Sequence, residues 1–244
     1  MGEGRRKKAN RRPGTGRRAA RAAGKARPRK PRAAAARAEP LPRDRGLRRD
    51  LIDAALELVE ASGTPGLGWR EVARRAGVSH SAAYRHFENK EALLAAVAEE
   101  GFRSLTERMV QQVADARDDV ASRFEAMAVA YVEFAAESPA RFRVMFGRDI
   151  PDINKHPALR EAHDHTDGLF RAGVAQVLES AGERGMAVDI DDFTLMAWSL
   201  VHGLASLIVD GRVGDVSEAA VDPGDRVRAM TGLIKAFTQR PRAG

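Results

Sequence analysis

The sequence contains no cysteine among its 244 residues. Disulfide bonds, thiolate metal sites and cysteine nucleophiles are therefore excluded together, and the composition fits a reducing compartment. The first residues carry the positive charge of a signal peptide, but no apolar segment follows them, so we expect no export. An organelle transit peptide is disfavoured because no serine precedes Ser62 and because proline and glycine interrupt any amphipathic helix.

Large apolar side chains are almost absent from residues 1–44, so this tail cannot bury enough surface to offset its ordering entropy and should be disordered. Residues 1–45 contain 17 Lys or Arg against 3 Asp or Glu, whereas the remainder contains 24 against 31. The net charge of +7 is thus a property of the tail. Three interpretations stay open: a nonspecific DNA-binding arm that acts by counterion release, a solvated segment without function, or a segment upstream of the true start codon.

Strand-like alternation of apolar and polar residues is also lacking, and an all-α fold is predicted. Apolar residues from Leu47 onward recur at spacings of three and four until Gly63. Two short helices should follow, from Trp69 to Ala76 and, capped by Ser79, to Phe87, before a long helix capped by Asn89. Asp189 and Asp222 can cap two later helices, the second of which has Pro223 at its first position. We divide the chain into the tail (1–44), an N-terminal helical domain (45–97) and a larger helical domain (98–244).

The segment from Trp69 to Phe87 has the spacing of a helix-turn-helix, with the small Ala73 where two helices touch and Gly77 at the tight turn. Polar groups on the second helix can reach base edges, and groups at its ends can reach phosphates. Residues 70–90 hold five cationic against two acidic side chains, which also favours DNA. A plain helical hairpin within a core is the competing interpretation. The predicted DNA-contacting residues are Arg70, Ser79, His80, Ser81, Tyr84, Arg85, His86 and Lys90.

From Arg45 to about Val97 the sequence resembles the DNA-binding domain of the TetR family of bacterial transcriptional regulators. The resemblance is carried by Val72-Ala73, Ala76-Gly77-Val78-Ser79, Tyr84, Phe87, Lys90-Glu91 and Leu93. It implies that Tyr84 and Lys90 contact phosphates and that the residues near His80, Ser81 and Tyr84 enter the major groove. Gly68 departs from the family pattern, in which Thr or Ser often caps the second helix and binds a phosphate, and Arg70 is our substitute for that contact.

An uncharged run of 17 residues extends from Phe193 to Val209. This length is at the lower limit for a membrane span, and its polar residues favour a buried helix instead. Trp198, His202 and Gly203 resemble the Trp and His-Gly motif of one class of TetR C-terminal domains. The run is apolar on almost every side and should be buried on every side. The resemblance implies a homodimer through the last two helices, with recognition helices about 34 Å apart on a palindromic operator.

A mostly apolar set of side chains in the larger domain suits a small amphipathic ligand, although such residues are more often plain core. The candidate pocket residues are Met127, Tyr131, Phe142, Met145, Phe146, His163, Phe170, Trp198 and His202. His163 and Asp167 lie one helical turn apart, but no HxxxH motif accompanies them, so we predict no metal and no cofactor. Without a phosphate-binding loop, a G-x-S-x-G turn or an HExxH motif, we also predict no enzymatic activity.

Together these features predict a sequence-specific transcriptional regulator, which we take to be a repressor released from its operator by a small-molecule effector. Its expected partners are double-stranded DNA, the effector and a second copy of the chain, with no membrane. It should act in the bacterial cytoplasm and lie on the nucleoid when bound. The alternative is an architectural protein that binds DNA without sequence preference through the basic tail.

Overall fold

The computed structural model describes residues 42–147, 151–182, 188–213 and 222–238. The predicted disordered tail, residues 1–44, lies outside this part of the chain except at its last three positions. These three belong to the first helix, so that helix begins before the predicted start at Leu47. Its first residue is Pro42, which fits the start of a helix because the backbone N–H that proline lacks would have no helical partner there.

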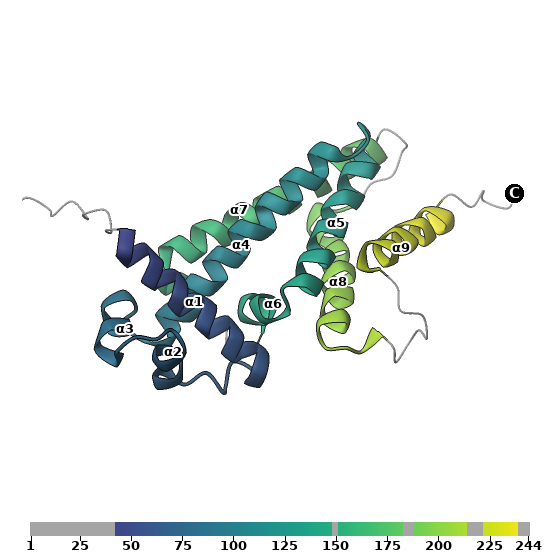
Figure 1. The fold of residues 1–244 in the computed structure, drawn as a ribbon. Helices are drawn as coiled ribbons and strands as arrows, with labels where there is room; N and C mark the ends of the chain where they lie inside the picture. Colours follow the sequence, from purple (N-terminus) through teal and green to yellow (C-terminus); the bar gives the residue numbers. More distant parts are fainter. Residues whose placement is uncertain (1–41, 148–150, 183–187, 214–221, 239–244) are drawn as a thin grey trace, which may run out of the picture. The chain divides into compact units, whose positions relative to one another are not determined.

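The predicted all-α fold is confirmed: the described segments form helices and contain no strand (Figure 1). In chain order the helices are α1 (Pro42–Ser62), α2 (Trp69–Arg75), α3 (His80–His86), α4 (Lys90–Asp115), α5 (Val120–Glu137), α6 (Pro139–Phe146), the 3-10 turn η1 (Ile153–Lys155), α7 (Pro157–Gly182), α8 (Ile190–Val209) and α9 (Pro223–Thr238).

The predicted N-terminal caps are present. Ser79, Asn89, Asp189 and Asp222 each accept a hydrogen bond from a backbone N–H two or three residues later. Such caps satisfy helical N–H groups that have no partner within the helix. Each cap therefore sets the start of a helix from local sequence alone, which is why these boundaries agree with the prediction.

The helix-turn-helix consists of α2 and α3, and α1 packs against α2 and α4. Leu51, Ile52 and Val72 are fully buried in this part of the core. Between α2 and α3, Gly77 has a φ of +68°, in the left-handed region that glycine enters without steric cost. The predicted tight turn is therefore confirmed.

The long helix α4 packs against α1, α5, α6 and α7. The predicted domain boundary at residues 97 and 98 falls inside this helix, and residues 40–244 form one compact unit. Buried residues of one continuous core extend from Leu51 in α1 to Val227 in α9. The division into two domains thus remains a functional proposal, because no break in packing accompanies it.

Helix α8 covers the uncharged run and packs against α5 and α7. Four of its large apolar residues nevertheless stay exposed: Leu195, Met196, Trp198 and Leu200 are 62, 45, 41 and 39% exposed. Burial on every side is therefore wrong for a single copy of the chain. Within the described segments, α8 is also the one helix long and apolar enough to cross a membrane by length and composition.

Candidate nucleic-acid interface and internal pocket

The outer face of α3 presents the predicted base-contacting side chains. His80, Ser81 and Arg85 are exposed, whereas Ala82 and Ala83 are buried against the rest of the helical unit. The short alanines let α3 pack closely, and the helical period turns the polar residues to the opposite side. The structure thus brings these predicted residues together on one accessible surface.

The ring of Tyr84 on this surface contacts two neighbouring aromatic rings. Its ring centroid lies 5.1 Å from that of Trp69 and 4.9 Å from that of His80, and 48% of the residue is exposed. Trp69 is the first residue of α2 and was not among the predicted site residues. The sequence shows that Trp69 begins α2, directly after Gly68. Its contact with Tyr84 could not be predicted, because that contact forms only in the folded chain.

The positive charge counted in the sequence is partly neutralised. Arg74 pairs with Glu71, and the Arg75 guanidinium lies 2.8 Å from the Glu57 carboxylate. The hydrogen bond from Arg74 lowers the pKa of Glu71. Within the described residues, Arg70 and Arg85 make no ion pair or hydrogen bond, so their charges face the solvent. These two arginines are the better candidates for phosphate contacts.

The three other predicted DNA-contacting residues, Lys90, Ser79 and His86, differ in the hydrogen bonds that they make within the chain. The Lys90 ammonium donates to the Thr64 carbonyl at 2.7 Å, which leaves two of its three hydrogens for another acceptor. The Ser79 hydroxyl serves as the α3 cap. His86 is half-buried and makes no hydrogen bond with the rest of the described chain.

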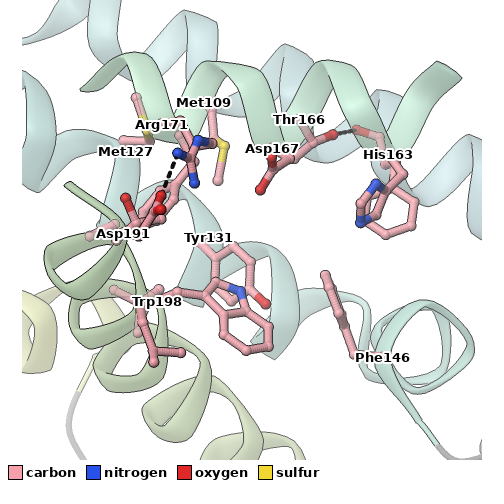
Figure 2. A pocket seen from close by; sticks show the side chains of 16 residues that line it. Met109, Met127, Tyr131, Phe146, His163, Thr166, Asp167, Arg171, Asp191 and Trp198 are labelled. Atoms are coloured by element: carbon pink, nitrogen blue, oxygen red, sulfur yellow. Dashed lines mark hydrogen bonds and ion pairs between the residues drawn. The ribbon is translucent and has the colours of Figure 1, made fainter. Parts of the chain in front are cut away.

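A pocket of about 450 Å³ lies between α4, α5, α7 and α8, with α6 at one end (Figure 2). Six of the nine predicted pocket residues line it: Met127, Tyr131, Phe146, His163, Phe170 and Trp198. The pocket residues that the prediction missed are Phe102, Met109, Ala128, Thr166, Asp167, Arg171, Asp191, Thr194, Leu195 and Val201. Most of its walls are thus apolar or aromatic, as expected for a small-molecule site.

Three predicted pocket residues, Phe142, Met145 and His202, are not among the side chains that line this pocket. Phe142 and Met145 are only 4 and 2% exposed and belong to the core. His202 lies behind Trp198, with the two rings stacked at 4.6 Å and 19°. Helical spacing identified the inward side of each helix, but it could not separate pocket lining from the layer behind it.

His202 instead joins the pocket wall to the core. Its Nδ1 is 2.8 Å from the Tyr131 hydroxyl, and its ring also stacks on Phe142 at 5.5 Å. Burial raises the pKa of Tyr131 far above its ordinary value and lowers that of His202. Burial thus disfavours the charged form of both groups, and their neutral forms can share this hydrogen bond.

The buried imidazole should make stability depend on pH. In the unfolded chain His202 takes up a proton as the pH falls through its ordinary pKa of 6.5, whereas the folded chain does so only at lower pH. The stability is thus full above that value and declines as the pH falls toward the folded pKa. We expect His202→Gln to lose less free energy of unfolding than wild type between about pH 7.5 and pH 5.5. Urea unfolding followed by circular dichroism measures both slopes. His165→Gln, an exposed substitution on α7, should keep the wild-type slope, and equal slopes for all three proteins would contradict the assignment.

The polar side of the pocket comes from α7 and the first turn of α8. His163, Asp167 and Arg171 recur every four residues along α7 and face the pocket (Figure 2). The Arg171 guanidinium lies 2.7 Å from the Asp191 carboxylate. Among the described residues no group of three His, Asp or Glu side chains could hold a metal ion.

Comparison with known proteins finds two family models that match this sequence. Residues 51–97 match the model described as bacterial regulatory proteins, tetR family, and residues 124–232 match the model described as tetracyclin repressor-like, C-terminal domain. An uncharacterized HTH-type transcriptional regulator of Bacillus subtilis, YobS, is 28% identical over 77% of this chain and 88% of its own length. The class A tetracycline repressor from transposon 1721 of Escherichia coli is 45% identical over 28% of this chain and 31% of its own length. A Rhodococcus protein of unknown function has a similar structure, with a TM-score of 0.62 and 29% identity over 86% of this chain and 98% of its own.

Proposed function

Because this chain belongs to the TetR family of bacterial transcriptional regulators, we propose that it is a homodimeric repressor whose pocket ligand releases it from a palindromic operator. The chain is a DNA-binding transcriptional regulator of the repressor type. The proposed steps are the dimer, the DNA contacts by α3 and release by an effector. We assign it no catalytic residue and place it in the bacterial cytoplasm, on the nucleoid when bound.

One observation carries the proposed coupling between ligand and DNA. Helix α4 begins with Lys90 beside the helix-turn-helix and carries Phe102 and Met109 in the pocket wall. A ligand that moves these two side chains acts on the same rigid element that carries Lys90. A coupling free energy of about 1–3 kcal/mol is typical for such linked sites.

A second contact supports the proposed coupling of the pocket to the DNA-binding surface through α4. Lys155 and His156, in the segment between α6 and α7, lie 3.8 and 3.6 Å from the Glu91 carboxylate. Glu91 belongs to the first turn of α4, next to Lys90. Because η1 packs against α7, displacement of α7 by a ligand would also reach the start of α4 through these contacts.

The exposed side of α8 supports the proposed homodimer. Met196 and Leu200 lie on it with the small residues Ser199 and Gly203, and a Cβ at Gly203 would meet no other atom within 4 Å. Small residues in an apolar surface allow close approach of another helix. A second copy would bury this surface and complete the environment that an apolar helix requires.

The function is tested by selecting bound fragments from a random duplex pool with the full chain at about 150 mM salt, where nonspecific binding is weakened. We expect a palindrome with two half-sites. The dimer variant Leu200→Arg should bind this palindrome only with the affinity of a single half-site and should sediment as a monomer. The control Val110→Arg adds the same charge at an apolar residue of α4 that is 51% exposed, and it should bind normally. Enrichment of no sequence would favour the architectural alternative.

A further inference from the structure

The pocket contains one carboxylate that the fold leaves without a partner. Asp167 makes no hydrogen bond or ion pair with any described residue, although its side chain lines the pocket. In Figure 2 it extends from α7 toward the space above Tyr131 and Trp198. Because it is charged, exposed at the pocket and beside apolar walls, it is a candidate for a ligand contact.

The other polar side chains of the pocket are already engaged. Thr166 and Thr194 donate to the carbonyl groups of Ala162 and Ile190, at 3.0 and 2.6 Å. The Tyr131 hydroxyl contacts His202, and Nδ1 of His163 lies 3.0 Å from the carboxylate of its neighbour Asp164. Each of these groups thus already has a partner within the fold.

The single guanidinium of the pocket is also occupied. Arg171 pairs with Asp191 at 2.7 Å, and this hydrogen bond is the main cause of its raised pKa. Asp167 acts on Arg171 only through space. An anionic ligand at Arg171 would lie close to the carboxylates of Asp191 and Asp167, so two like charges oppose it. A cation meets the opposite situation, since Asp167 is free to receive it.

The walls around Asp167 suit an organic cation. Tyr131, Phe170 and Trp198 supply aromatic rings to the same pocket. One face of the Trp198 ring stacks on His202, and the residue is 41% exposed, so it is accessible from the pocket. Aromatic faces attract cations through the ring quadrupole and also bury apolar substituents.

We infer that the pocket binds a lipophilic organic cation, with Asp167 as its counter-ion and the aromatic rings as its walls. This inference rests on the proposed function, because it names the chemical class of the effector. It concerns binding to the free protein, however, and can therefore be tested without the operator.

The test uses two ions of the same shape and opposite charge. Calorimetric titration of the full chain with tetraphenylphosphonium should show saturable binding, whereas the isosteric anion tetraphenylborate should bind at least about tenfold more weakly. A slimmer cation, benzyldecyldimethylammonium, is titrated in parallel in case the bulky ion does not fit. Asp167→Asn should weaken binding of the cation about tenfold. The matched control Glu161→Gln removes the same charge from an exposed position of α7 outside the pocket and should have no effect.

Three results would overturn the inference: stronger binding of the anion, equal binding of both ions with no effect of Asp167→Asn, or no binding of either cation. Operator release is measured separately by adding the cation to the DNA complex. If the chain does not bind a selected operator, the proposed function fails while the calorimetric result stands. If the cation binds without weakening the DNA complex, the ligand class holds and its role as effector fails.

Discussion

Replacement of His80, Ser81 and Tyr84 together by alanine is expected to weaken operator binding by about a thousandfold or more. These side chains are exposed on one face of α3 and have no part in its buried side. Each lost base or phosphate contact costs about 1–3 kcal/mol, and three such losses account for the expected effect. Fluorescence anisotropy with the selected palindrome measures the affinity.

The control for this variant is the double substitution Ser104→Ala with Glu107→Ala on the exposed side of α4, which should bind like wild type. Thermal unfolding should be nearly unchanged in the control, whereas the α3 variant should lose about 0.5–1.5 kcal/mol of stability with the ring contact between Tyr84 and Trp69. Binding to random duplex DNA distinguishes sequence-specific from nonspecific binding. The α3 variant should bind this DNA with the same weak affinity as the wild type. Wild-type affinity of the α3 variant for the palindrome would refute the assignment of α3 as the recognition helix.

Gly101→Val is expected to lower the free energy of unfolding by about 1–3 kcal/mol. A Cβ at this position of α4 would lie 2.4 Å from the sulfur of Met145 and 3.1 Å from Cγ of Arg141, both on α6. Met145 is 2% exposed and enclosed by the core, so it cannot move aside cheaply. The substitution should therefore push α6 away from α4, which chemical denaturation followed by circular dichroism will detect.

The matched control is Gly168→Ala on α7, where a Cβ meets no other atom within 4 Å. That substitution should raise stability by about 0.5–1 kcal/mol because alanine favours the helix interior over glycine. The Gly101 variant should also show altered ligand release of DNA, because α6 carries Phe146 in the pocket wall and packs against both α4 and α1. Unchanged stability of Gly101→Val would show that the α4 and α6 contact is loose.

The sequence by itself determined the helices, their caps and the helix-turn-helix, because these depend on residues close together in the chain. Ser79 caps α3 through an N–H three residues later, and Gly77 permits the turn through its own φ. The polar face of α3 follows equally from helical period. Local hydrogen bonds and backbone sterics carry that information, so it can be recognised without the fold.

Only the tertiary structure decided which side chains surround the pocket and which charges are free. The positive charge of residues 70–90 is smaller than the sequence suggests because Arg75 pairs with Glu57, which lies 18 residues away in the chain. Phe142 and His202 proved to lie behind the pocket, and Asp167 and Arg171 in it, although all four lie on helices that the sequence predicts. Helical period specifies which side of a helix faces inward. Which residues lie opposite that side depends on how helices distant in the sequence pack together. Burial, ion pairing and pocket shape therefore depend on the same packing.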